Sequence, residues 1–266
     1  MPHQPHHRLS RQVFLLLILL AAALQPAEAH DTWFEALPGP TLALGTGTRF
    51  PAQETGIDRQ FLVQQGCHLR DGSTQPMQPL ADAPSSLQLR PPASAQSCWV
   101  QLAPLRIEVA PALVPVYLNE IAASPQLRAL WDGRRARGLP WTERYTKHAR
   151  VELDDGTTPA PMAGLGLEMW VDSGGRPRRV GEPLQFQVLR DGQPLAGLPV
   201  ELRHENSALG LWRRTDEAGR VRLALPWPGR WLLRGVDLRV ADDDADAWDS
   251  RFATLAFDVL PRTAAP

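Results

Sequence analysis

Several features are scarce in this chain of 266 residues, and each shortage narrows the possible functions. Its two cysteines are too few and too far apart in sequence to form a metal site of their own. The 28 basic side chains nearly balance the 29 acidic ones, which leaves no electrostatic footprint for nucleic acid or anionic lipid. No G-x-S-x-G elbow, H-E-x-x-H pair or phosphate-cradling glycine loop occurs, so these catalytic and nucleotide-binding signatures are absent.

One unbroken apolar run is present, from Val13 to Leu24. It is too short to span a bilayer, because a membrane helix needs about 20 apolar residues. Histidines and arginines precede the run, and the sequence AEA that ends at residue 29 has the small-residue spacing of a signal-peptidase site. We therefore expect residues 1–29 to be a cleaved signal peptide, His30 to begin the mature protein, and the periplasm to be its location. The alternatives are an uncleaved anchor or a cut a few residues later.

Cys67 and Cys98 are expected to form a disulfide, because an exported chain meets an oxidising compartment. The bond would close an interval that is rich in Pro, Ser, Gln and Asp and has little apolar periodicity. Closing such a loop stabilises a fold by about 3 kcal/mol through chain entropy. His68, directly after the first cysteine, is expected in a surface loop.

Short alternating apolar runs predict a mainly β fold. Over residues 30–105 these runs are bounded by Gly, Pro and Asp, which is typical of an antiparallel sandwich, and the 26 prolines and 20 glycines disfavour a helical bundle. Helical spacing of apolar residues occurs only from Val114 to Trp131. Ser124, a plausible helix cap, and Pro125 interrupt this stretch, so two short helices fit better than one.

The length after residue 29 suits two modest domains. We expect an N-terminal β-sandwich module over residues 30–160, with the helical segment near 114–131, and a linker with the first strand of the next module over residues 161–177. An immunoglobulin-like or transthyretin-like β-sandwich follows over residues 178–262. In this second module, strand alternation turns His204 toward the core, which predicts an inner histidine with its hydrogen bonds satisfied.

A histidine at the start of a processed chain offers two nitrogens from one residue. The α-amine, with a pKa near 8, and the imidazole Nδ1 of His30 would form a chelate ring around a transition metal. Imidazole nitrogen suits nickel, cobalt, copper and zinc, and a second histidine would complete a three-nitrogen set favoured by Cu(II) and Ni(II). Any residue left ahead of His30 would turn the amine into an amide and remove the chelate.

Three further residues are candidates for completing this metal site. His148, in the segment RYTKHAR, opens a strand after a helical stretch, and Asp31 and Asp237 could add oxygen ligands. The alternative for His148 is an exposed histidine whose basic neighbours oppose a bound cation. Asp237 lies in a strand that is apolar on both faces, so it needs a partner: a metal, an arginine such as Arg234, or a backbone donor.

Six segments, taken in order, resemble the bacterial periplasmic family labelled domain of unknown function 4198: AHDTWFE, LGTGTRFPAQE, VYLNEI, WTERYTKHARVEL, GLGLEMW and the alternating C-terminal strands. Members are described as NikM-like, or as the periplasmic component of nickel or cobalt uptake, and the resemblance implies two immunoglobulin-like β modules. By position, the family's mature N-terminal histidine matches His30, its following aspartate matches Asp31, and the histidine of its Y-x-K-H-A pattern matches His148. Where many members read valine-histidine this chain has aspartate at Asp237, so an oxygen stands where a nitrogen ligand is expected.

The expected function is therefore binding of a divalent transition metal, nickel, cobalt or copper, by an exported protein that is not an enzyme. It would support metal uptake or homeostasis and hand the ion to a membrane metal transporter, with no nucleic-acid partner and no stable membrane insertion after signal cleavage. Two alternatives stay open. One is a structural or interaction module whose C-terminal sandwich presents loops to a protein or glycan, and the other is a copper redox enzyme with an N-terminal histidine.

Overall fold

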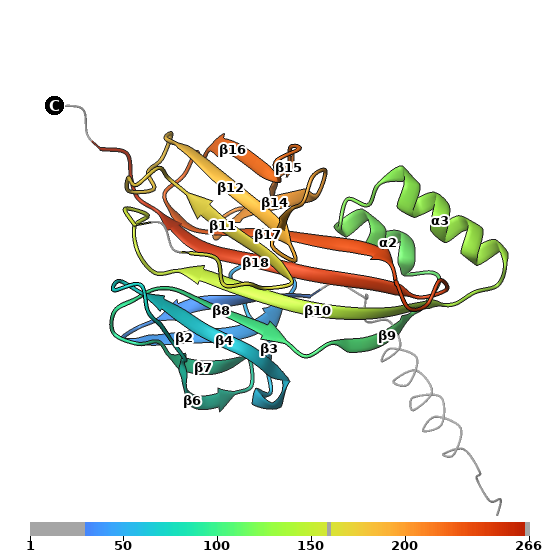
Figure 1. The fold of residues 1–266 in the computed structure, drawn as a ribbon, viewed down its shortest axis with the longest axis horizontal. Helices are drawn as coiled ribbons and strands as arrows, with labels where there is room; N and C mark the ends of the chain where they lie inside the picture. The colour runs from blue at the N-terminus through green and yellow to red at the C-terminus, as the bar shows by residue number, and fades with distance from the viewer. Residues whose placement is uncertain (1–29, 159–160, 264–266) are drawn as a thin grey trace, which may run out of the picture.

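The computed structural model describes residues 30–158 and 161–263 of the chain. The expected signal peptide, residues 1–29, lies outside the described residues, as does its cleavage site. The described residues form three β-sheets, two α-helices and one short 3₁₀ helix, η1 (Arg59–Phe61). The prediction of a mainly β protein is confirmed, and the sheets stack in a sandwich-like arrangement (Figure 1).

A nine-stranded sheet forms the middle layer. Its strand order is β15-β14-β17-β18-β10-β8-β4-β5, with β9 also paired to β10, so it contains strands from both expected modules. β10 and β18 run parallel, whereas β10 pairs antiparallel with β8, and β18 pairs antiparallel with β17. The strands of this sheet are β4 (Leu62–Leu69), β5 (Thr74–Gln75), β8 (Ala95–Leu102), β9 (Leu105–Val109), β10 (Trp141–Glu152), β14 (Pro199–His204), β15 (Leu211–Arg214), β17 (Gly229–Val240) and β18 (Trp248–Val259).

A five-stranded antiparallel sheet packs against one face of this layer through a buried apolar core. That core includes Cys67 on β4 and Cys98 on β8, whose sulfurs are 2.02 Å apart, so the predicted disulfide is confirmed. The bond joins two neighbouring strands inside the core and does not tie down a loose loop. The strands of the five-stranded sheet are β1 (Asp31–Leu37), β2 (Thr41–Gly47), β3 (Thr55–Gly56), β6 (Gln78–Ala83) and β7 (Ser86–Arg90).

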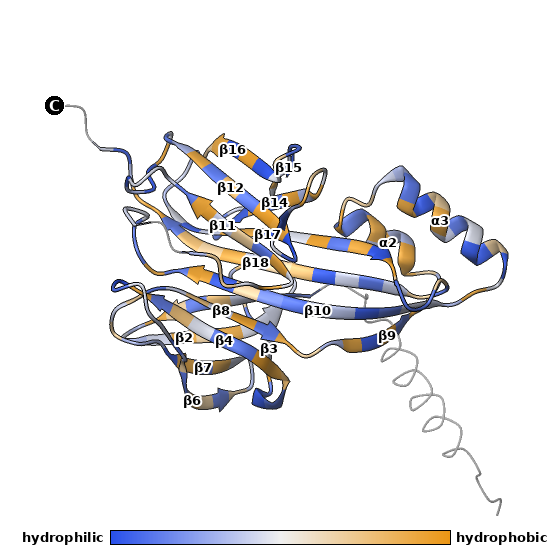
Figure 2. Cartoon of the chain, in the orientation of Figure 1, coloured by the Kyte–Doolittle hydropathy of each residue, from blue (hydrophilic) through white to orange (hydrophobic). Residues whose placement is uncertain are grey.

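A four-stranded sheet covers the other face of the middle layer. Its apolar side chains pack on those of β14, β17 and β18. In Figure 2 orange and blue residues alternate along several of the outer strands, which is the pattern expected for a strand with one face toward a core. The strands of this sheet are β11 (Leu167–Asp172), β12 (Pro183–Arg190), β13 (Gln193–Pro194) and β16 (Arg220–Ala224).

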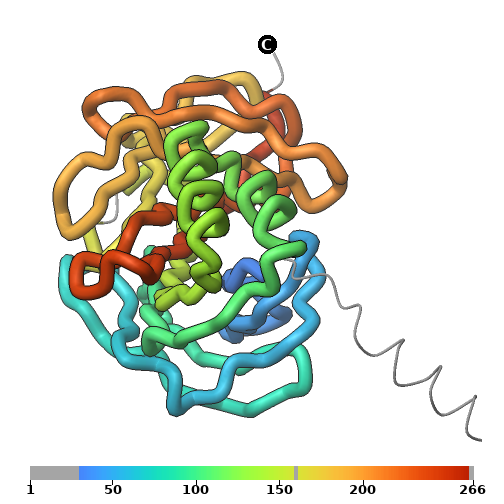
Figure 3. Tube along the Cα trace, turned by 90° about the vertical axis from the view of Figure 1, so that its right-hand side faces the viewer, coloured from blue at the N-terminus to red at the C-terminus, as the bar shows by residue number. Residues whose placement is uncertain are grey.

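The two predicted helices are present as α2 (Val114–Glu120) and α3 (Pro125–Ala136). Ser124 caps α3, since its Oγ accepts a hydrogen bond from the backbone N–H of Leu127 at 3.2 Å. Both helices lie over the ends of β10, β17 and β18, between the two outer sheets (Figures 1 and 3), where Trp131 of α3 packs on a buried aromatic cluster. No helix in the described part of the chain is long and apolar enough to cross a bilayer.

Two histidines outside the expected metal set can now be placed. His204 points inward as predicted, and its Nε2 donates to the backbone carbonyl of Pro228 at 2.9 Å. The expectation that His68 lies in a surface loop is wrong, because it belongs to β4 and is buried against the ring of Trp99. The turn-forming residues that suggested a loop begin only after β4 ends.

Candidate functional site

His30 directly precedes β1 and has an exposed side chain. Its backbone carbonyl accepts a hydrogen bond from Nζ of Lys147, on β10, at 2.8 Å. Burial lowers the pKa of this lysine to about 8. A cavity of about 390 Å³ opens beside His30 and is also lined by Tyr145. The contact with β10 therefore fixes the backbone of His30 while its imidazole stays accessible.

Glu54, which the sequence did not single out, is the acidic residue that faces this histidine. Its Oε2 lies 3.6 Å from Nε2 of His30. Its Oε1 accepts hydrogen bonds from the hydroxyl of Thr48 at 2.6 Å and from the backbone N–H of the same residue at 3.3 Å. These bonds, followed by the charge of His30, lower the pKa of the Glu54 carboxyl. An ionised and oriented carboxylate therefore stands next to the exposed imidazole.

Asp31 is predicted to be a metal ligand, but its side chain forms ion pairs with arginines. It is 2 % exposed, and its Oδ2 lies 2.5 Å from Nε of Arg234 and 3.5 Å from Nη1 of Arg203. Glu201 contacts both of these arginines. Asp31 thus belongs to a buried group of two acids and two guanidinium ions, which satisfies its charge without a metal.

His148 is neither the exposed histidine of the alternative interpretation nor a neighbour of His30. It is 3 % exposed, and its Nδ1 donates to the backbone carbonyl of Phe252 at 3.0 Å. Burial lowers the pKa of this imidazole to about 4. Its Nε2 lies beside Gly166, where the guanidinium of Arg251 also lies, and that positive charge opposes a bound cation. His148 therefore occupies the core as a neutral histidine.

Asp237 finds its partner among the arginines, although not the one considered from the sequence. Its carboxylate pairs with Nη1 of Arg190 and, at 3.1 Å, with Nε of Arg239. Arg234 cannot reach it, because residues three positions apart on a strand point to opposite faces. Two arginines therefore compensate the charge of this aspartate.

The middle sheet separates the four predicted ligands into two pairs. Lys147 contacts His30 on the face that carries β1, so its neighbour His148 must point to the opposite face. Asp237 lies on that second face too, since it is paired in register with Arg251, next to the imidazole. His30 and Asp31 lie on the first face. Within residues 30–158 and 161–263, no group of three or more His, Cys, Asp or Glu side chains is placed to hold a metal ion.

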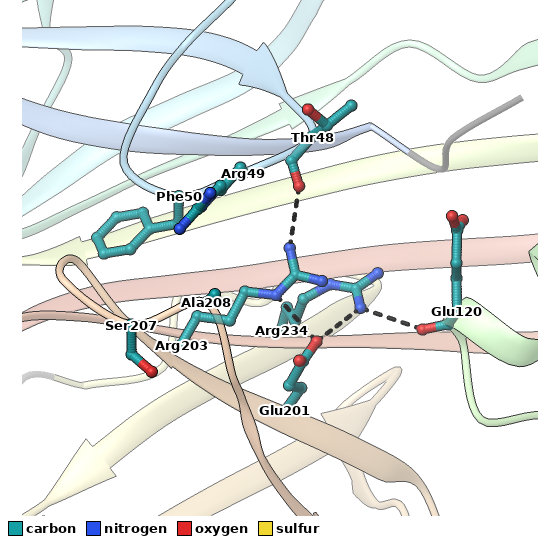
Figure 4. A pocket seen from close by; sticks show the side chains of 9 residues that line it. All are labelled: Thr48, Arg49, Phe50, Glu120, Glu201, Arg203, Ser207, Ala208 and Arg234. Carbon is teal, nitrogen blue, oxygen red and sulfur yellow. Dashed lines mark hydrogen bonds and ion pairs between the residues drawn. The ribbon is translucent and has the colours of Figure 1, made fainter. Parts of the chain in front are cut away.

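A second cavity, of about 380 Å³, lies beside the buried ion group and was not predicted from the sequence. Figure 4 shows Arg203, Arg234 and Glu201 in its middle, with Arg49 and Glu120 toward opposite ends. The sequence carried part of this signal, because residues 201 and 203 share the strand face opposite to His204. It did not show that this polar face looks into a cavity.

Fold and contacts together define a mainly β, disulfide-linked protein of stacked sheets, with an accessible histidine at the start of its first strand. The family described as domain of unknown function (DUF4198) matches residues 132–236, which supports the resemblance over that segment. The matched segment runs from α3 into β17 and includes His148, whereas His30 and Asp237 lie outside it. No curated protein matches the chain.

Proposed function

We propose that this protein, exported and processed before His30, is a periplasmic binding protein for a divalent transition metal, nickel, cobalt or copper. The ion is held by the amine and Nδ1 of His30 and is passed to a membrane metal transporter. The protein acts by binding and not by catalysis. Neither His148 nor Asp237 binds the ion, because both lie on the other face of the middle sheet. Asp31 does not bind it either, because its carboxylate is paired with Arg234 and Arg203.

The observation that carries this proposal is the position of Glu54. Metal-binding histidines usually present their second ring N–H to a carboxylate, which orients the ring and raises its basicity. Glu54 faces Nε2, so the nitrogen left over is Nδ1, which can form a six-membered chelate ring together with the amine. Thr48 holds the carboxylate in place. The contacts of Glu54 with His30 and Thr48 thus support a chelate formed by Nδ1 and the amine.

The remaining coordination positions of such an ion would be open. The cavity beside His30 provides room for ligands that come from solvent or from another molecule. An ion held by two protein nitrogens exchanges more readily than one enclosed by four side chains, because fewer bonds have to break. This arrangement suits an ion that is cargo and is handed on.

The test is calorimetric titration of Ni(II), Co(II), Cu(II) and Zn(II) into protein that begins at His30. The matched control carries an acetyl group on the His30 amine, which removes this nitrogen as a ligand and adds no new amine. We expect binding of Ni(II), Co(II) or Cu(II) to the first form and at least a hundredfold weaker binding to the second. Glu54→Gln should weaken binding by about 10- to 100-fold, the usual effect of losing such a carboxylate partner.

His148→Asn distinguishes the proposed site from the set expected from the sequence, and it should leave metal affinity unchanged. Equal binding by the two N-terminal forms, or loss of binding in His148→Asn, would contradict the proposal. Absence of heat in every form would favour the structural or interaction module. Intact-mass measurement of the exported protein determines where cleavage occurs, and reductant-dependent oxygen consumption with copper bound would support the redox enzyme instead.

A further inference from the structure

The cavity around Arg49, Arg203 and Arg234 is separate from the proposed metal site and shows features of a ligand site of its own. Its volume of about 380 Å³ falls in the range of small-molecule sites. The loop after β2, the end of α2 and the β14–β15 hairpin loop surround it (Figure 4). Three segments distant in sequence therefore enclose one polar space.

The floor of the cavity is a buried and internally balanced ion group. Glu201 Oε2 accepts hydrogen bonds from Nε of Arg203 at 2.9 Å and from Nη1 of Arg234 at 3.0 Å. Asp31 is the fourth member of the group, and its carboxylate pairs with Arg234. Two guanidinium ions are thus matched by two carboxylates, although burying such groups costs several kcal/mol per ion before their pairing is counted. Apolar residues of similar volume could fill the same space without this cost. We therefore look for a functional role of the group in addition to packing.

Hydrogen-bonding capacity remains at the mouth of the cavity. Nη1 of Arg203 donates a hydrogen bond to the backbone carbonyl of Thr48 at 3.3 Å. Nη2 of the same guanidinium has no hydrogen bond to a described residue. Arg49 is exposed and forms no ion pair with any residue of the described ranges. Both guanidinium groups line the same cavity. Charged donors without acceptors are therefore available on the side of the cavity formed by the loop after β2.

We propose that this cavity binds a small organic carboxylate, held by Arg49 and the free edge of Arg203. A planar guanidinium presents paired N–H groups that match the two oxygens of a carboxylate. The acids of the floor do not repel such a ligand strongly, because each is already shared between two guanidinium ions. The absence of a side chain at Gly210 leaves room for Glu201, since a Cβ at this position would collide with the Glu201 side chain.

The test uses acetate, succinate, citrate and glutamate as probes, titrated at constant ionic strength into protein that carries an extra leading glycine and no metal. Failure of metal binding therefore has no bearing on the outcome. We expect at least one probe to bind, its neutral amide not to bind, and the backbone amide signals of Ser207 and Ala208 to shift on binding. Arg49→Gln should weaken binding by about tenfold or more, since it removes one charge-assisted pair.

Arg49 is exposed and forms no ion pair within residues 30–158 and 161–263, so Arg49→Gln should fold normally, which circular dichroism can verify. Arg213→Gln is the matched control: it removes an exposed arginine of the β14–β15 hairpin that does not line the cavity, and it should leave affinity unchanged. The proposal is overturned if none of the four carboxylates binds at millimolar concentration. It is equally overturned if Arg49→Gln binds like the parent protein, or if Arg213→Gln loses as much affinity.

Discussion

His148 illustrates how a side chain that suggests metal chemistry can be part of the core. Its pKa is lowered to about 4 by burial, against an ordinary value near 6.5 in the unfolded chain. Between these two values the unfolded chain binds a proton that the folded chain does not. Stability should therefore be lost as pH falls from 6.5 to 4 and regained as pH rises, and this one residue should contribute about 2–3 kcal/mol to the change.

Urea unfolding at pH 7 and pH 4.5 measures this effect. His148→Asn keeps an N–H donor near the carbonyl of Phe252 and cannot titrate, so its stability should fall less between the two pH values than that of the parent protein. Some dependence should remain, because burial also lowers the pKa of His68. An unchanged pH dependence in His148→Asn would show that its imidazole is not buried and neutral.

Asp31 leads to a prediction that separates a structural role from metal binding. Asp31→Asn leaves Arg234 and Arg203 without a carboxylate that both share, and breaking a buried pair in this way costs about 3–5 kcal/mol. Asp82→Asn is the control, because Asp82 pairs with Arg59 at the surface, where the effect should stay below about 1 kcal/mol. Urea unfolding measures both. Metal affinity at His30 should be unchanged in folded Asp31→Asn, and a loss of affinity there would identify Asp31 as a ligand after all.

At the scale of single residues, sequence reasoning succeeded where the constraint is local. The inward direction of His204 follows from strand alternation alone, and the disulfide follows from two cysteines in a chain that its sequence predicts to be exported. The contact between His30 and Glu54 depends on how the segment after β2 folds back, and the pairing of Asp31 with Arg234 joins residues about 200 positions apart. Neither contact leaves a periodic pattern in the sequence.

Helix α3 offers a matched pair of glycines for testing the fold at the scale of elements. Gly133 lies in the exposed helix interior, and a Cβ there would meet open space, so Gly133→Ala should stabilise the protein by about 0.5–1 kcal/mol. Gly138 lies just beyond the helix with φ +75°, a conformation that costs alanine about 1–2 kcal/mol. Gly138→Ala should therefore destabilise. Thermal or urea unfolding of the two variants should give shifts of opposite sign, and shifts of equal sign would mean that α3 ends elsewhere.

The helices were predictable because their signals are contiguous: an apolar stripe, a serine cap and a proline at the start of the second helix. The pairing of β10 with β18 was not, because these strands are about 100 residues apart and run parallel. Antiparallel alternation predicts that strands exist, yet it does not say which strand lies beside which. Alternation along β10 puts Lys147 and His148 on opposite faces, and the packing of β1 on the middle sheet decides which of the two lies near His30.

For the whole molecule, the continuous middle sheet predicts cooperative unfolding. β10 pairs with β18 over the registers from Glu143 to Val151, and the core beneath the five-stranded sheet includes Leu232 and Ala256 from the C-terminal half. Unfolding either half would expose the apolar surface of the other. We therefore expect a single transition, with tryptophan fluorescence and far-ultraviolet circular dichroism giving coincident curves in urea.

A fragment of residues 161–266 tests directly whether the C-terminal half can fold without the N-terminal half. It keeps the four-stranded sheet with β14, β15, β17 and β18, but β18 loses β10 and becomes an open edge, and the face that carries β1 loses its apolar cover. Such a fragment should fail to show a cooperative transition or should associate through that edge, as size-exclusion chromatography and urea unfolding would reveal. A stable monomeric fragment would instead show that the C-terminal module expected over residues 178–262 folds independently when the preceding strand β11 is included, and the middle sheet would then contain a contact between two domains.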